Sequence, residues 1–252
     1  MSSSSSNHPP PLPLPPPDSQ ISPTASLTYW NSIPPNISGM LGGYPYISRV
    51  DLQGSKNFLA KLRRWPTSTS ATNGGKGKGK KLKRVVDCGA GIGRVTKGFL
   101  VEVGEVVDVV EPVEKFVGEV RRWGKAGGEG EKVGDIYVVG LEDWKPIKTY
   151  DLIWNQWCLG HLTDSQLLQY LKRCRDAVSQ EEDGWIVVKE NMSTNTDGSD
   201  IFDELDSSVT RADSKFRSIF QQAGLEIVRT ELQKGFPREL YPVRFYALRP
   251  AS

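Results

Sequence analysis

The sequence of 252 residues predicts a single α/β domain in which helices cover both faces of a mainly parallel, seven-stranded sheet. From residue 83 onward, short apolar runs alternate with amphipathic stretches, which is typical of repeated strand–helix units. Hydrophobic residues make up 37% of the chain, enough for one core at this length. The last two apolar runs are joined by a loop with two prolines, which predicts a terminal antiparallel hairpin.

Seven apolar runs are predicted to form the strands of this sheet. The parallel part consists of 84–88, 105–110, 136–140, 151–154 and 185–189, and the hairpin of 225–231 and 243–248. The helix after the fourth strand is the best marked, because Thr163 and Gln166 form a capping box before a stripe of apolar residues. A second apolar stripe ends at Gly224, which is typical of a helix C-terminus.

Three segments are expected to lie outside the sheet. Residues 1–26 are rich in Ser and Pro and cannot bury enough surface to offset the entropy of ordering, so they predict a disordered tail. Residues 27–65 are expected to form a helical N-terminal cap, and 66–83 a flexible Gly/Lys loop. The remaining residues, 84–252, are expected to form the cofactor-binding core that contains the sheet. The proline-rich tail could dock on an SH3-type groove as a weak partner, although an unstructured extension is favoured.

The composition excludes several classes of protein. A net charge of +2 is too balanced to indicate nucleic acid or an anionic membrane as the default partner. No apolar run approaches the ~20 residues of a membrane span, and no signal peptide is apparent. Cys88, Cys158 and Cys174 show no metal-ligand or redox spacing, so we expect reduced thiols and no metal site. These features predict a cytoplasmic protein with access to the nucleus.

A glycine-rich turn follows the first predicted strand, in the segment 87–94 (DCGAGIGR). Glycines allow the backbone to approach a ligand closely. Glu111 ends the next strand 22 positions after Gly89, close to the spacing of about 20 residues at which a carboxylate binds a ribose. Arg94 stands where a dinucleotide fold needs its third glycine, which disfavours a nicotinamide cofactor. The turn therefore predicts another ribose-bearing ligand.

The same turn resembles the first motif of class I methyltransferases, whose Rossmann-like fold binds S-adenosyl-L-methionine and releases S-adenosyl-L-homocysteine. The resemblance implies that the glycine turn faces the methionine portion of the cofactor, that Glu111 holds the ribose and that the segment 141–143 contacts the adenine. It also implies a lid over the cofactor. The implied cofactor residues are Gly89, Gly91, Arg94, Glu111, Leu141, Glu142, Gln156, Trp30 and Met40.

Three further segments, 29–43, 151–164 and 191–208, resemble the protein α-N-terminal methyltransferase family. The similarity extends from about residue 29 to the end of the chain. It implies methylation of the α-amino group of proteins that begin Xaa-Pro-Lys or Xaa-Pro-Arg, with ribosomal or chromatin proteins as the expected substrates. Membranes are not expected partners, and nucleic acid is disfavoured.

An α-amine with a pKa of about 7.7–8.0 is largely protonated at neutral pH, so it must lose a proton before it attacks a methyl group. The resemblance gives His161 and Asp206 the role of deprotonating and orienting this amine. It gives Asn191 the role of binding the first peptide carbonyl of the substrate. The remaining substrate residues implied are Trp157 beside the amine, Leu41, Ile47, Leu240 and Tyr241 around the proline, and Asp203, Asp206 and Ser208 for the cation.

Each of these residues also has a purely structural interpretation. Taken alone, His161 is explained as a helix-start residue and Asp206 as part of an N-cap run. Their occurrence together with the family segments favours the functional interpretation. Glu111, Glu142 and Glu190 depart from the aspartate, glutamine and aspartate of the family pattern. A class I methyltransferase acting on RNA or a small molecule remains an alternative, as does a non-catalytic module recruited through the tail.

Overall fold

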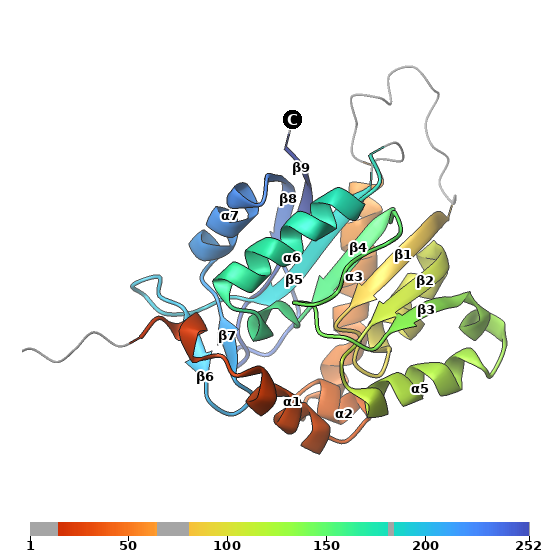
Figure 1. The fold of residues 1–252 in the computed structure, drawn as a ribbon, viewed down its shortest axis with the longest axis horizontal. Coiled ribbons are helices and arrows are strands. Elements are labelled where there is room, and N and C mark those ends of the chain that lie inside the picture. The colour runs from red at the N-terminus through yellow and green to blue at the C-terminus, as the bar shows by residue number, and fades with distance from the viewer. Residues whose placement is uncertain (1–14, 65–80, 181–183, 252) are drawn as a thin grey trace, which may run out of the picture.

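The computed structural model describes residues 15–64, 81–180 and 184–251. It confirms the predicted α/β architecture, with a seven-stranded sheet in the order β3-β2-β1-β4-β5-β9-β8 (Figure 1). The strands β1 to β5 run parallel, whereas β9 is antiparallel to both of its neighbours. The strands are β1 Leu82–Cys88, β2 Gly104–Val110, β3 Val133–Tyr137, β4 Leu152–Gln156, β5 Trp185–Asn191, β8 Leu225–Leu232 and β9 Val243–Pro250.

The third strand lies three residues earlier than the predicted 136–140. It pairs with β2 alone, and β2 ends at Val110, opposite Tyr137. Residues after Tyr137 therefore have no ladder partner in the sheet, although they continue the apolar run. Hydrophobicity alone did not set this boundary.

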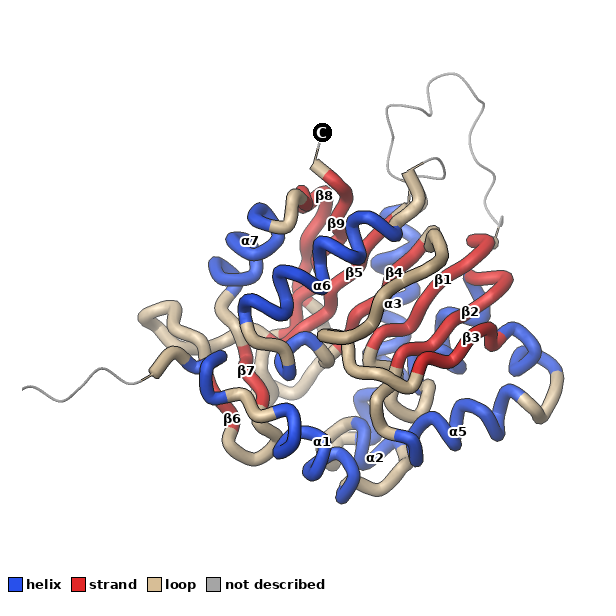
Figure 2. The backbone as a smooth tube through the Cα atoms, in the orientation of Figure 1, coloured by secondary structure: helices blue, strands red, loops and turns tan. Residues whose placement is uncertain are grey.

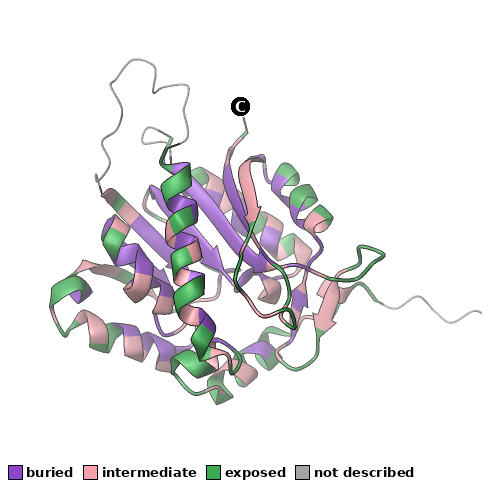
Figure 3. Cartoon of the chain, turned by 180° about the vertical axis from the view of Figure 1, so that it is seen from behind, coloured by how far each residue is buried: buried purple, intermediate pink, exposed green. Residues whose placement is uncertain are grey.

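Two layers of helices cover the sheet. One layer contains α3 (Ser48–Leu62), a short helix with a π-helical turn (Thr96–Leu100) that continues into α4 (Val101–Val103), and α5 (Glu114–Gly124). The other contains α6 (Asp164–Ala177), with the predicted capping box, and α7 (Asp213–Gln222). The view from the α3 side shows strands that are buried over most of their length (Figure 3).

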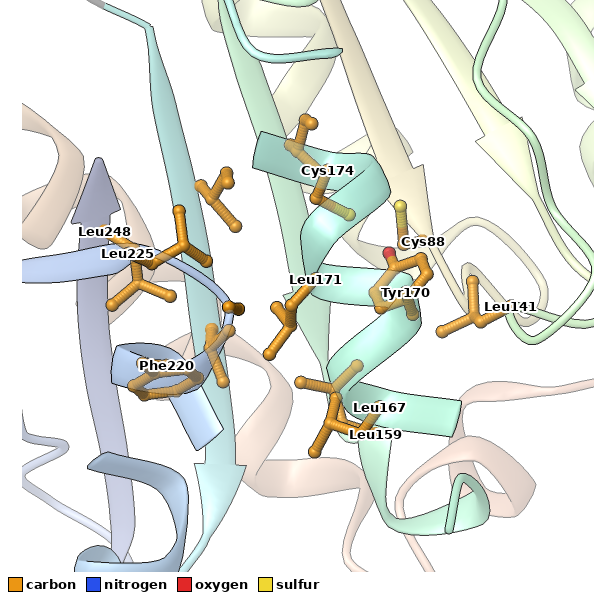
Figure 4. Packing of buried hydrophobic residues seen from close by; sticks show 14 of the residues in the cluster. Cys88, Leu141, Leu159, Leu167, Tyr170, Leu171, Cys174, Phe220, Leu225 and Leu248 are labelled. Atoms are coloured by element: carbon orange, nitrogen blue, oxygen red, sulfur yellow. The ribbon is translucent and has the colours of Figure 1, made fainter. Parts of the chain in front are cut away.

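Alternation along the strands separates two cores, because successive side chains in a strand point to opposite faces. Val85 and Trp154 pack with Phe58 of α3, whereas Val86 and Ile153 belong to the cluster under α6 and α7. Figure 4 shows the second cluster, in which side chains of α6 and Phe220 of α7 point toward the strands. These two cores fix the sheet edge at which the parallel strands end.

The N-terminal segment differs from the prediction in two ways. Most of residues 17–26, predicted as part of a disordered tail, are helical: a 3-10 turn spans Pro17–Gln20, and α1 begins after two extended residues and spans Pro23–Ser32. Polar tethers rather than apolar burial hold them, since the Asp18 carboxylate accepts from the Asp164 N–H at 3.0 Å and the Ser22 N–H donates to Ser207 Oγ at 2.8 Å. Residues 1–14 of the predicted tail, residue 65 of the predicted cap and residues 66–80 of the predicted loop lie outside the described residues, whereas Leu82 and Lys83, also predicted as loop, belong to β1.

The predicted cap also divides into two parts. Together with α2 (Ile37–Met40) and a 3-10 turn (Pro45–Ile47), α1 lies along the edge at which β1 and β4 end (Figure 2). By contrast, α3 packs on the face of the sheet as a core helix. A small hairpin of β6 (Ile201–Asp203) and β7 (Ser208–Thr210), which was not predicted, adjoins the 3-10 turn at Pro17–Gln20. In the described part of the chain, no helix is long and apolar enough to cross a bilayer.

Candidate active site

A cavity of about 320 Å³ opens at the carboxyl ends of β1 and β4. β2, which follows β1 in the chain, lies on one side of β1, and β4 lies on the other side. Open α/β sheets bind ligands at such a point, where the strand order reverses. The volume lies within the range of about 300–1,000 Å³ typical of small-molecule sites. All nine residues expected to bind the cofactor line this cavity: Trp30, Met40, Gly89, Gly91, Arg94, Glu111, Leu141, Glu142 and Gln156.

The glycine turn forms the floor of the cavity, and its backbone requires glycine. Gly89 and Gly91 have φ angles of 66° and 56°, a region that residues with a Cβ avoid. A Cβ at Gly89 would also lie 2.3 Å from Cys158 Cβ. The carboxylate of Asp87, just before the turn, accepts from the N–H of Thr96 at 2.9 Å and so anchors the following helix. The turn is therefore held close to β4.

Glu111 directly follows β2 and connects the glycine turn to the segment before α5. Its Oε2 accepts from the Gly91 N–H at 2.7 Å and its Oε1 from the Val113 N–H at 2.9 Å. Burial raises the pKa of Glu111 to about 7, although both N–H groups favour the anion. A carboxylate in this position can accept hydrogen bonds from hydroxyl groups of a ligand.

Arg173 of α6, which sequence reasoning missed, holds the wall that is expected to contact adenine. Its guanidinium donates to the carbonyls of Leu141 and Glu142 at 2.9 and 2.8 Å and to that of Trp144 at 2.8 Å. One side chain thus satisfies three loop carbonyls. A residue of the core helix fixes the shape of this part of the cavity.

Behind the opposite wall lies a buried ionic cluster that sequence reasoning missed. Asp51 of α3 forms ion pairs with Lys189 of β5 and with Arg94, whose Nη1 lies 2.7 Å from Asp51 Oδ2. Gln156 Nε2 also donates to Asp51, at 2.9 and 3.0 Å. Burial opposes the ionisation of Asp51, but Lys189 and Arg94 outweigh it and lower the pKa of the carboxyl group.

His161 lines the cavity and connects it to α1. Trp30 Nε1 lies 3.1 Å from His161 Nε2, and Ser26 Oγ lies 2.9 Å from His161 Nδ1. An indole N–H can only donate, so Nε2 is the acceptor and the neutral ring carries its proton on Nδ1. Burial lowers the pKa of His161, while Asp206 acts in the opposite direction. In this arrangement Trp30 occupies the basic lone pair of the histidine.

Trp157 follows β4 and lines the cavity in a strained backbone conformation, with φ of 54°. Its Nε1 is buried and donates to no residue that the structure describes. Arg94 and Lys189 lie 5.6 and 5.8 Å from the centroid of the indole ring. The indole therefore presents an unused donor beside two cations.

Glu190 lies beneath this segment at the end of β5. Its Oε1 accepts from the N–H groups of Cys158 and Leu159, both at 2.9 Å. Burial raises the pKa of Glu190 to about 7, against the effect of these donors. The side chain fixes the turn that carries Trp157 and leads to His161.

We expect Glu190→Gln to remove a pH-dependent part of the stability. The folded chain keeps the Glu190 proton to about pH 7, whereas the unfolded chain loses it near pH 4.5, so this residue lowers the free energy of unfolding as pH rises between those values. Denaturant titrations at about pH 5 and pH 7.5 measure this effect. Between the two pH values, the free energy of unfolding should fall by about 1–3 kcal/mol more in the wild type than in the variant. Equal losses would contradict this role.

Asp206 lies in the β6–β7 hairpin beside this site. Its Oδ1 is buried and accepts no hydrogen bond from the described residues. Its negative charge acts to raise the pKa of His161 and the pKa of Tyr29 of α1. In the same hairpin, Asp203 is exposed and accepts from the Leu205 N–H at 2.9 Å, and Ser208 pairs with Asp203 in the β6–β7 ladder.

The other expected substrate residues do not line the cavity. Asn191 is the last residue of β5 and pairs with Val243. Leu41 and Ile47 are buried, whereas Leu240 is partly buried and Tyr241 is 38% exposed. The segment that carries Leu240 and Tyr241 lies near the segment that follows Leu41 and Ile47. Gly235 approaches Val50, and the charge of Glu239 acts to raise the pKa of Tyr46. The structure thus brings the cofactor residues together in one cavity, and the residues expected to surround the proline are not among those that line it.

Comparison with known proteins identifies the family. Residues 18–249 match the model of a family described as AdoMet dependent proline di-methyltransferase. The chain belongs to this family. It is therefore a methyltransferase that uses S-adenosylmethionine, as the resemblance of the glycine turn to class I methyltransferases implied. The residues around the cavity fit this cofactor, since its lining includes the Glu111 carboxylate, which can accept from ribose hydroxyls, and the guanidinium of Arg94, which can bind a carboxylate.

Individual relatives agree with this assignment. The α-N-terminal protein methyltransferase 1 of Schizosaccharomyces pombe is 44% identical over 90% of this chain and 95% of its own length. The N-terminal Xaa-Pro-Lys N-methyltransferase 1-A of Xenopus laevis is 40% identical over 88% of this chain and 92% of its own length. A solved SAM-dependent methyltransferase of Leishmania major is 34% identical, with a TM-score of 0.75 over 90% of this chain and 82% of its own.

Proposed function

We propose that this methyltransferase transfers methyl groups to the α-amino group of proteins whose exposed N-terminus reads Xaa-Pro-Lys or Xaa-Pro-Arg. The name of the Schizosaccharomyces pombe relative describes methylation of a protein α-N-terminus, and that of the Xenopus laevis relative adds the Xaa-Pro-Lys sequence. One observation supports it most strongly: the buried Oδ1 of Asp206 lacks a donor among the described residues, and the side chain acts on His161 at the cofactor cavity. An unpaired buried acceptor is costly, and a substrate ammonium group would supply its donor.

The proposed chemistry assigns a step to each group. S-adenosylmethionine supplies an electrophilic methyl group when it is bound. Asp206 accepts a proton from the substrate ammonium, so that the nitrogen lone pair becomes available for attack. His161, neutral because burial lowers its pKa, orients this region and ties α1 over the cavity through Trp30. The Nε1 of Trp157, buried without an acceptor in the described chain, can donate to a carbonyl of the bound peptide.

Recognition beyond the amine is proposed for the hairpin and the outer loops. Asp203, which is exposed, with Asp206 and Ser208 would pair with the cation of the third substrate residue. Asn191 would donate to the first peptide carbonyl, and Leu41, Ile47, Leu240 and Tyr241 would surround the proline. Ribosomal and chromatin proteins with this N-terminus are the proposed substrates, and the cytoplasm with access to the nucleus is the proposed location.

A peptide panel tests the substrate proposal. The purified enzyme should add mass in methyl steps to peptides that begin Ser-Pro-Lys or Pro-Pro-Lys, and not to the same peptides with an acetylated N-terminus. Asn191→Ala should lower kcat/KM by about 10-fold or more, because one hydrogen bond to the chain end is lost. Methylation of the acetylated peptides at lysine, or of none of the peptides, would overturn the proposal.

A further inference from the structure

The ionic cluster behind the cavity contains more positive than negative charge. The Asp51 carboxylate is shared between two cations, Arg94 and Lys189, and the fourth member, Gln156, is neutral. The side chains of Asp51 and Lys189 are fully buried, and that of Arg94 is 8% exposed. A buried charge without a partner is costly, so a cluster of this kind favours an additional anion.

Only one of the two cations reaches the ligand space. Arg94 lines the cavity, whereas the ammonium group of Lys189 lies behind it, where it donates to Ser55 Oγ at 3.1 Å. Arg94 binds Asp51 through Nη1, and a guanidinium has five N–H donors, so donors remain for an anion in the cavity. Asp87 also interacts electrostatically with Arg94, but its carboxylate accepts hydrogen bonds from the N–H and the hydroxyl group of Thr96.

We propose that Lys189 is a positioning residue for the cofactor: by neutralising Asp51 from behind, it leaves the charge of Arg94 available to the carboxylate of the cofactor's methionine portion. Without Lys189, Asp51 and Arg94 would form a closed ion pair and the cavity wall would be neutral. The inference rests on the use of S-adenosylmethionine. It does not depend on the protein substrate proposed above, and its test uses no peptide.

The test compares two ligands that differ at the methionine end. S-adenosylhomocysteine carries the carboxylate, and 5′-methylthioadenosine lacks the whole amino-acid portion. Calorimetric titration of Lys189→Met should give a Kd for S-adenosylhomocysteine at least about tenfold higher than in the wild type, with the Kd for 5′-methylthioadenosine changed by less than about twofold. Methionine keeps the apolar stem, which places the Lys189 Nζ 4.5 Å from the Phe245 ring centroid.

A matched control is Lys215→Met, which removes a lysine that pairs with Asp164 and Asp200 in another part of the molecule. This variant should keep the wild-type ratio of the two affinities. If Lys189 only stabilises the fold, Lys189→Met will weaken both ligands by the same factor or neither of them. Either result would overturn the proposal.

A measurement on the wild type covers the case in which Lys189→Met does not fold. Burial lowers the pKa of Lys189 to about 8, against the effect of Asp51. The affinity for a carboxylate ligand without an amine, 4-(5′-adenosylthio)butanoate, should therefore fall relative to that for 5′-methylthioadenosine as pH rises from about 7 to about 9. A constant ratio would overturn the proposal. The groups that face Lys189 are Asp51 and Ser55 of α3, Arg94, and the rings of Trp157 and Phe245.

Discussion

Asp206→Asn is expected to lower kcat/KM for a Ser-Pro-Lys peptide by about 10²- to 10⁴-fold, the range typical of a lost general base. Asparagine has nearly the same shape, but its amide cannot take a proton from the substrate ammonium. The Oδ1 of Asp206 is buried and accepts from no described residue, so the substitution breaks no internal hydrogen bond at that atom. Steady-state kinetics at saturating cofactor measure the effect.

Two controls separate catalysis from folding and from substrate binding. S-adenosylhomocysteine should bind Asp206→Asn as it binds the wild type, because Asp206 does not line the cavity. Asp203→Asn, in the same hairpin but exposed, should raise KM for the peptide with little change in kcat. An Asp206→Asn enzyme that keeps its kcat would exclude the carboxylate as the base.

Glu111→Gln is expected to weaken S-adenosylhomocysteine binding by about 10- to 100-fold, the equivalent of losing one hydrogen bond to a charged group. Both carboxylate oxygens of Glu111 accept backbone N–H groups. The amide of glutamine would place its own N–H against one of these donors. Calorimetry on the purified chain measures the change in Kd.

The pH dependence of binding provides a second observation for Glu111. Because the pKa of its carboxyl group is raised to about 7, the anion that accepts ribose hydroxyls forms as pH rises from about 6 to 8. Wild-type affinity for 5′-methylthioadenosine, which has the ribose but no carboxylate, should increase over this interval, and the increase should be absent in Glu111→Gln. Glu114→Gln, at an exposed ion pair with Arg121, is the matched control and should behave as the wild type. A Glu111→Gln variant with wild-type affinity at both pH values would contradict the ribose assignment.

Local sequence patterns were sufficient to predict most of the sheet and the glycine turn with Glu111, whereas the other cofactor residues, such as Trp30 and Gln156, came from the family resemblance. Strand periodicity, the capping box at Thr163 and the glycine turn depend on residues that are close in the chain, and the structure contains each of them. Glu111 was found because its distance from the turn is set by one helix and one strand. The location of β3 was shifted, since pairing with the end of β2 decided its boundary.

The contacts that local patterns could not predict join residues far apart in the chain. Trp30 and His161 are 131 positions apart, and Asp51 and Lys189 are 138 apart. A weak signal for the ionic cluster was nevertheless present. Asp51 and Ser55 lie at helical spacing with the buried Phe58 and Leu62, and Lys189 ends an otherwise apolar run of β5. Charged residues in the apolar phase of two elements indicate a buried pair, but they do not identify which residues form it.

The position of β9 has a consequence for how the chain is made. This last strand, Val243–Pro250, lies between β5 and β8, and β8 has no other neighbour in the described sheet. During synthesis on the ribosome, β8 therefore emerges before the strand that will hold it, and the sheet can close only once β9 has also emerged. A chain that stopped before β9 would leave the edges of β5 and β8 without hydrogen-bond partners, and unpaired strand edges of this kind are sites of aggregation.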